Sequence, residues 1–205
     1  NTLGPSVFSG CTSLESITLP NSITSISEYA FQNCTNLKTV KIPEQLTSFG
    51  KQSFENCTNL VSITVPENIR AIGSNAFKGC YKLVEVINKS SLNISKGSSD
   101  YGYIAYYAKV VHNGESKIVN KDGYLFITAD EVNYLIGYVG NDTELILPES
   151  YNGANYKING YAFYKCSSLT SVTIPDGVKS IGEYAFYGCS RLKSITIPDG
   201  VKSIG

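Results

Sequence analysis

The chain has 205 residues, and its 17 Lys and Arg residues balance its 17 Asp and Glu residues, so the formal net charge is zero. The sequence shows no basic stripe, which argues against nucleic acid as a partner. No apolar run approaches the ~18 residues that a membrane-spanning helix requires, so we expect no membrane span in this fragment.

A 23-residue module recurs along the chain. A phenylalanine returns at this constant step, with a cysteine three residues after it and a leucine three residues after the cysteine. The phenylalanines are Phe8, Phe31, Phe54, Phe77, Phe163 and Phe186, and the cysteines are Cys11, Cys34, Cys57, Cys80, Cys166 and Cys189. Such a period predicts a solenoid in which each coil stacks on its neighbours. Because the chain begins and ends within a repeat, we expect it to be a piece of a longer array.

Residues 34–57 show how one repeat builds a coil. The Leu-x-x-Val-x-Ile-Pro spacing at 37–43 predicts a short strand, which the proline ends because it has no N–H to give to a sheet. The polar segment 51–54 predicts a single helical or 3₁₀ turn on the outer side. Gly or Asn follows each Phe by two residues and tolerates a left-handed backbone. Lys165 occupies that position once, and we expect a less regular coil there.

The six cysteines occupy the same position of each repeat. Stacked coils hold equivalent side chains parallel, whereas a disulfide needs Cβ atoms about 3.8 Å apart. The sequence has no Cys-x-x-Cys pair, and its only histidine, His112, is distant in sequence from all six. We therefore expect free, buried thiols and no bound metal or other cofactor. We also expect a single buried ladder of phenylalanine rings that contains Phe31, Phe54, Phe77 and Phe186.

The period is lost in the middle of the chain, which predicts three parts: repeats at 1–88, a β-rich island at 89–143 and repeats again at 144–205. Within the island, Asp122-Gly123 is a hairpin signal. The expected strands of this β-meander are Ser116–Asn120, Tyr124–Thr128 and Asn133–Val139. We expect the strand near Val86 to pair with the strand near Leu145, with the island looping out between them.

The repeat resembles the BspA-type leucine-rich repeat. The resemblance rests on Leu-x-x-Ile-x-Leu-Pro at 14–20 with Ala30-Phe31 after it, and on the cleaner copy at 169–186, and it covers residues 1–88 and 144–205. It implies a right-handed leucine-rich-repeat solenoid with a parallel sheet. It also implies a secreted or surface-displayed bacterial protein that is associated with adhesion to host or microbial proteins.

The solvent-facing positions of the predicted strands are one candidate site, because their short hydroxyl-rich side chains suit a flat surface for a protein or a glycan. The ordinary preference of Thr for exposed strands explains the same pattern. The tyrosines of the island are a second candidate, since Tyr is favoured at interfaces; a small meander also needs them for its own core. The candidates are Ser16, Thr18, Thr39, Lys41, Ser62, Thr64, Glu85, Tyr101, Tyr103, Tyr106, Tyr107, Ser171, Thr173, Ser194 and Thr196.

Catalysis has little support in the sequence. A nucleophile–histidine mechanism would need His112, which lies in an expected loop, and no phosphate-binding or metal-binding motif is present. The leading interpretation is a non-enzymatic extracellular module that binds a protein ligand in adhesion. The alternatives are a glycan-binding module that uses the island tyrosines and a structural spacer in a larger surface protein.

Overall fold

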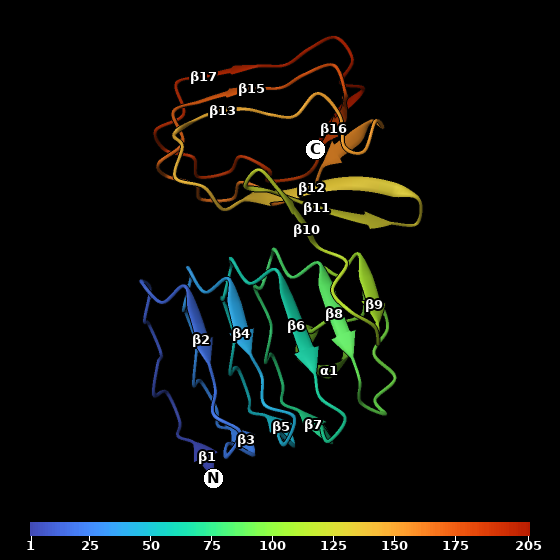
Figure 1. The fold of residues 1–205 in the computed structure, drawn as a ribbon. Coiled ribbons are helices and arrows are strands. Elements are labelled where there is room, and N and C mark those ends of the chain that lie inside the picture. Colours follow the sequence, from blue (N-terminus) through green and yellow to red (C-terminus); the bar gives the residue numbers. More distant parts are fainter. The chain divides into compact units, whose positions relative to one another are not determined.

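The structure is a computed structural model that describes residues 1–205. It consists of two compact units, Asn1–Ser116 and Lys117–Gly205. Each unit is a stack of coils in which short parallel strands of successive repeats lie side by side (Figure 1).

The regular coils of the first unit have a strand before a proline turn, at Pro20, Pro43 or Pro66, and a two-residue strand after it. The strands before the turn form two sheets, ordered β2-β4 and β6-β8-β9, and the strands after it form one sheet, ordered β1-β3-β5-β7. The first set is β2 (Ser16–Thr18), β4 (Thr39–Lys41), β6 (Ser62–Val65), β8 (Glu85–Asn88) and β9 (Val110–His112). The second set is β1 (Thr2–Leu3), β3 (Ser25–Ile26), β5 (Ser48–Phe49) and β7 (Ala71–Ile72).

The β-branched residues predicted to form the strands do so, and the proline begins the turn that follows. The carbonyl of Pro43 accepts a hydrogen bond from the N–H of Leu46 at 3.1 Å, which closes a tight turn. The pairing keeps the repeat in register, with Ile17 opposite Val40. The 23-residue period is therefore the length of one coil.

The third side of each coil is a run of tight turns and contains no helix, so the predicted helical turn is wrong. Tyr29, Gln52 and Asn75 have positive φ angles of 59°, 52° and 56° there, which no right-handed helix allows. Four residues after Tyr29, Asn33 is also left-handed, as its residue type predicts. Lys165, with a φ of 55°, has the same conformation as its counterparts, so the expected irregularity at that position is wrong too.

Aromatic rings and thiols fill the centre of the first unit. Successive rings stack with centroids 5.3, 4.9 and 5.2 Å apart in the order Phe8, Phe31, Phe54, Phe77. The thiols are free, as predicted, and the sulfur of Cys57 donates to the carbonyl of Phe31 at 3.1 Å. The expected burial holds for Cys34, Cys57 and Cys80, but Cys11 is exposed, and Cys166 and Cys189 of the second unit are half-buried.

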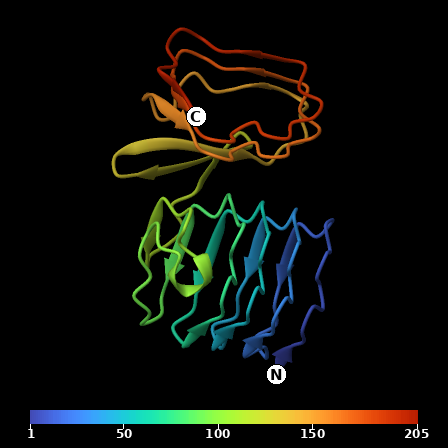
Figure 2. The same cartoon turned by 180° about the vertical axis from the view of Figure 1, so that it is seen from behind.

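Residues 89–116 form one further coil of the first unit. β9 pairs in parallel with β8, with Val86 opposite Val111, a step of 111 − 86 = 25 residues. This coil contains α1 (Asp100–Tyr103), seen in green in Figure 2, a single turn in which Tyr101 and Gly102 have positive φ angles of 49° and 67°. Its Ile104 and Ala105 are fully buried. Because β9 takes the edge of β8, the expected pairing of the Val86 strand with the Leu145 strand is wrong.

The second unit begins with an antiparallel meander, and the predicted island strands are confirmed to within a few residues. They are β10 (Val119–Lys121), β11 (Tyr124–Ala129) and β12 (Val132–Tyr138). β12 then pairs in parallel with the first repeat strand, which gives the sheet order β10-β11-β12-β14-β16-β18. A second sheet has the order β13-β15-β17. The repeat strands are β13 (Glu144–Ile146), β14 (Tyr156–Ile158), β15 (Ser171–Thr173), β16 (Val178–Ile181), β17 (Ser194–Thr196) and β18 (Ser203–Ile204).

The predicted island 89–143 is thus divided between the two units, with 89–116 in the first and 117–143 in the second. The phenylalanine ladder is divided in the same way. Phe186 stacks on Phe163 with ring centroids 5.1 Å apart, in the second unit. The expectation that Phe186 continues the ladder of Phe31, Phe54 and Phe77 is therefore wrong.

Candidate ligand-binding surface

The predicted line of polar side chains in the first unit lies on neighbouring strands. The register places Ser16 opposite Thr39 and Thr18 opposite Lys41, and all four are exposed. In the next sheet Ser62 and Thr64 occupy the same positions of β6, where they are half-buried. Six of the candidate residues therefore share one face of the first unit.

Glu85 does not belong to that surface, although the repeat pattern predicted a solvent-facing side chain. It is fully buried. One of its carboxylate oxygens lies 3.1 Å from Nε2 of His112, and the other accepts a hydrogen bond from Oγ of Ser116 at 2.6 Å. Both partners come from the coil that adds β9. That coil makes β8 an inner strand of its sheet and covers Glu85, so the prediction that Glu85 faces solvent is wrong.

Four candidates of the C-terminal repeats lie in the second unit, on the sheet β13-β15-β17. Ser171 stands opposite Ser194 and Thr173 opposite Thr196. All are exposed except Ser171, which is half-buried. The chain therefore has two separate strips of short polar side chains, one in each unit.

Two hollows lie where the strands of the first unit leave their sheets, each with a volume of about 600 Å³. The first is lined by Thr18 and the second by Thr64, and Lys41 and Glu44 line both. They are neighbours along the array, because they belong to successive coils. The second hollow lies between β4 and β6, where the two sheets of this face separate.

The lining of these hollows mixes charges with apolar surface. Lys41 and Lys89 bring positive charge and Glu44 and Glu67 bring negative charge, all from exposed side chains. Ile42 lies half-buried between them. Such a lining suits a ligand with both signs of charge and apolar groups, and it is unlike the single-sign surface that binds a polyanion.

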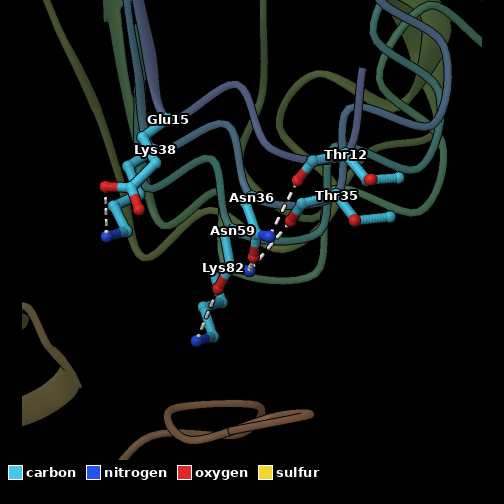
Figure 3. Close-up of polar contacts among 7 residues, drawn as sticks. All are labelled: Thr12, Glu15, Thr35, Asn36, Lys38, Asn59 and Lys82. Atoms are coloured by element: carbon cyan, nitrogen blue, oxygen red, sulfur yellow. Dashed lines mark hydrogen bonds and ion pairs between the residues drawn. The ribbon is translucent and has the colours of Figure 1, made fainter. Parts of the chain in front are cut away.

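The opposite end of the same strands carries a ladder of amide side chains that bond to the chain itself (Figure 3). Asn36 donates from Nδ2 to the carbonyl of Thr12 at 2.8 Å, and Asn59 does the same to Thr35. Lys82 donates to Oδ1 of Asn59 at 2.9 Å. Because these amides already have partners, the strand-exit end with its hollows is the better candidate for a ligand.

Three of the four candidate tyrosines of the irregular coil lie together. The ring of Tyr106 is 5.5 Å from that of Tyr103 and 4.9 Å from that of Tyr107, and Tyr107 packs edge-on against Tyr81 at 5.4 Å. Only Tyr106 is exposed, at 46%. Tyr101 instead packs against the hydrophobic core of the first unit.

A second tyrosine cluster, in the second unit, was not among the predicted sites. Tyr161 stacks on Tyr184 at 5.2 Å and Tyr164 on Tyr187 at 5.5 Å, and the two stacks meet edge-on. The ammonium of Lys165 lies 5.3 Å from the ring centre of Tyr164. The signal is present in the sequence as Tyr-Ala-Phe-Tyr at 161–164 and again at 184–187.

The fold does not require tyrosine at those positions. In the first unit the counterparts of Tyr161 are Ser6, Tyr29, Gln52 and Asn75, and those of Tyr164 are Ser9, Gln32, Glu55 and Lys78. Gln52 donates there to the carboxylate of Glu55 at 2.5 Å. Polar side chains therefore suffice to cover this turn, and the four-ring cluster is particular to the second unit.

The structure brings no three His, Cys, Asp or Glu side chains together in a way that could hold a metal ion. None of its helices has the length and apolar character needed to cross a membrane. The buried Glu85 and His112 pair has Ser116 on the carboxylate rather than on the imidazole, which is not the order of a nucleophilic triad.

Comparison with known proteins gives one family match. A profile described as the BspA type leucine rich repeat region matches residues 1–101 and 145–205, in six copies. No curated protein sequence matches the chain significantly.

Several solved structures are similar to the chain. A leucine rich cell surface protein from Faecalibacterium prausnitzii A2-165 is 26% identical, with a TM-score of 0.42, over 98% of this chain and 52% of that one. A leucine rich repeat protein of T. pallidum is 24% identical, with a TM-score of 0.41, over 100% of this chain and 66% of that one. The pneumococcal vaccine antigen PcpA is 22% identical, with a TM-score of 0.43, over 91% of this chain and 51% of that one. The chain thus spans about half to two thirds of the length of these proteins.

Proposed function

The chain belongs to the BspA-type leucine-rich repeat family, and we propose that it is a non-enzymatic binding module that acts in adhesion outside the cell. Its ligand is a protein of a host or microbial surface. The location, secreted or at a bacterial cell surface, is proposed from the family's association with such surfaces.

The pair of adjoining hollows in the first unit is the observation that carries the proposal. They lie on successive coils and share Lys41 and Glu44, so together they form one groove along the axis of the array. A groove in this direction suits an extended peptide segment of a ligand, which would cross the strand exits one coil after another. The mixed charges and the half-buried Ile42 supply the polar and apolar contacts that protein interfaces combine.

A displayed library of linear peptides, selected on the immobilised chain, tests this proposal. Lys41→Glu should lower the affinity of the chain for the selected peptides by at least about tenfold, which corresponds to ~1.4 kcal/mol of binding free energy. Lys78→Glu is the matched control, because Lys78 is also exposed but lies on the turn side of its coil. Equal loss in both variants, or in neither, would contradict the groove as the binding site.

The tyrosine cluster of residues 103, 106 and 107 supports a second candidate function, the binding of a glycan. The exposed ring of Tyr106 sits on two supporting rings, and an aromatic face suits a sugar. On a glycan array, signals that disappear in Tyr106→Ala and persist in Tyr29→Ala would favour this candidate. An absence of both peptides and glycans would favour the structural spacer.

A further inference from the structure

The chain contains three Asn-Gly dipeptides, at 113–114, 152–153 and 159–160. In such a dipeptide the glycine nitrogen can attack the asparagine side-chain amide to form a five-membered succinimide. Glycine favours the reaction because it has no side chain to obstruct the ring and its backbone rotates freely. The three sites differ in their surroundings, and only one has a base at the attacking nitrogen.

At Asn113-Gly114 that base is the only histidine of the chain. The backbone N–H of Gly114 donates to Nδ1 of His112 at 3.2 Å. Since a backbone N–H can only donate, Nδ1 is the unprotonated nitrogen, and Nε2 carries the hydrogen of the neutral ring. That hydrogen points to the carboxylate of Glu85, 3.1 Å away.

The carboxylate is itself held in place. Glu85 is fully buried on β8, and its second oxygen accepts a hydrogen bond from Oγ of Ser116 at 2.6 Å. The side chain of His112 is only 14% exposed. Glu85 is therefore a positioning residue, which fixes both the orientation and the tautomer of the ring, as a carboxylate does for the imidazole of a catalytic triad.

We propose that Asn113 is a site of self-modification, at which the chain deamidates its own side chain with His112 as general base. His112 Nδ1 takes the proton of the Gly114 nitrogen as that nitrogen bonds to Cγ of Asn113. The protonated ring then returns a proton to the departing NH₂ group, which leaves as ammonia. Water opens the succinimide at either carbonyl, giving aspartate or isoaspartate, so the net change is addition of water and loss of ammonia.

The surroundings leave room for the ring and for water. Asn113 and Gly114 are both exposed. A Cβ placed on Gly114 would meet only His112 Nδ1, at 3.7 Å.

The other two dipeptides lack these features and serve as controls within the same molecule. Asn152-Gly153 is locked in a tight turn with positive φ angles of 51° and 74°, closed by backbone hydrogen bonds of 2.9 and 3.0 Å between Tyr151 and Ala154. Asn159 is buried, and its side-chain nitrogen donates to the carbonyl of Gly160 at 3.0 Å.

The modification would place a new negative charge, and in the isoaspartate form an extra backbone carbon, three residues before Ser116, where the first unit ends. The modification is an irreversible chemical change that the fold itself promotes, and it is independent of the proposed binding function.

Peptide mapping by mass spectrometry during prolonged incubation of the full chain tests the proposal, with released ammonia and isoaspartate measured in parallel. Asn113 should convert faster than Asn152 and Asn159. It should also convert at least about tenfold faster in the folded chain than in the same chain in guanidinium, because general-base catalysis typically contributes about 10²–10⁴-fold. A rate in the folded chain equal to or below that in guanidinium would overturn the proposal.

Two variants locate the chemistry. His112→Gln keeps an amide that can reach Glu85 but supplies no base, and it should remove the advantage of the folded chain. Gly114→Ala, for which there is room, should slow the conversion in the folded and unfolded chains alike. Conversion of Asn113 in His112→Gln at the parent's rate would also overturn the proposal. Should that variant unfold, the comparison of folded and unfolded parent chain decides the matter.

Discussion

The ring of Phe54 stacks on the ring of Phe31 with centroids 4.9 Å apart and planes 15° apart. That separation is close to the spacing of neighbouring strands in a sheet, about 4.8 Å. The backbones of the two coils are hydrogen-bonded at the same place, because the N–H of Phe31 donates to the carbonyl of Ser53 at 2.7 Å. Side-chain stacking and strand pairing thus set the same distance between coils.

Phe54→Ala should lower the free energy of unfolding by about 3–5 kcal/mol, since it empties a fully buried position between two rings. Phe8→Ala is the matched control: Phe8 stacks on Phe31 alone and is only half-buried, so its loss should cost less. Denaturation in urea, followed by circular dichroism, measures both. Equal losses would contradict the assignment of Phe54 to the centre of the ladder.

The cysteines should differ in reactivity according to their place in the stack. Burial raises the pKa of the Cys34 thiol to about 11, and it raises the pKa values of Cys57 and Cys80 well above their ordinary value of 9.0. In native buffer a thiol-specific disulfide reagent should therefore modify Cys11 rapidly and these three only after unfolding. Non-reducing denaturant should expose all six thiols; a smaller number would show that disulfides exist.

The same pKa shifts make the folded state less stable in alkali. The unfolded chain releases thiol protons above a pKa of 9.0, whereas folded Cys34 keeps its proton up to about pH 11. The free energy of unfolding should accordingly be independent of these thiols below pH 9 and should fall as the pH rises between the two values. Unfolding at about pH 8 and about pH 10.5 measures the fall. A variant with Cys34, Cys57 and Cys80 replaced by Ala should lose less stability over this pH range. If the variant loses as much as the parent, the thiols are not the cause of the loss.

Glu85 should contribute to the stability of the fold rather than to ligand binding. Glu85→Ala removes a fully buried carboxylate together with its bonds to His112 and Ser116, and we expect a loss of about 3 kcal/mol. Ser62→Ala changes the residue opposite it on β6, which is half-buried, and should stay within about 0.5 kcal/mol. Chemical unfolding compares the two. A stable Glu85→Ala protein that loses ligand binding would restore the original expectation of a contact residue.

The meander should act as a cap for the second unit. Phe126 of β11 stacks on Tyr151 at 4.3 Å and meets Tyr156 edge-on at 5.3 Å. A chain of residues 117–205 should fold, whereas residues 144–205 alone would expose the edge of β14 and these rings, and should aggregate or stay unfolded. Gel filtration and circular dichroism of both would decide. A well-folded, monomeric 144–205 would show that the cap is dispensable.

The sequence was sufficient to predict the features that repeat. The Phe and Cys positions predicted the core, and Pro43 and its counterparts predicted where the strands end, because each of these residues meets similar surroundings in the inner coils. At the start of the stack Phe8 is half-buried and Cys11 is exposed. The coil at 89–116 was missed because it has no Leu, Cys or Phe at the repeat positions. Val111, the partner of Val86 in the next strand, follows it by 25 residues and so falls outside the 23-residue step.

The site was predicted only where it follows the repeat. Thr18 and Lys41 could be placed on one face because their register follows from the period. The burial of Glu85 could not, since its partners His112 and Ser116 come from the unrecognised coil. The second hollow depends on the separation of β4 from β6, which no residue pattern indicated.

Each coil of the first unit meets its neighbour through equivalent pairs, with Ile17 opposite Val40 as Ile63 is opposite Val86. A stretch of DNA that encodes 23 residues can therefore be gained or lost by recombination between tandem copies without leaving a mismatched face. Insertions of other lengths must be absorbed within one coil, as the 25-residue coil absorbs two extra residues. Gain or loss of a whole copy changes the length of the stack by one strand spacing and leaves the contacts between coils the same.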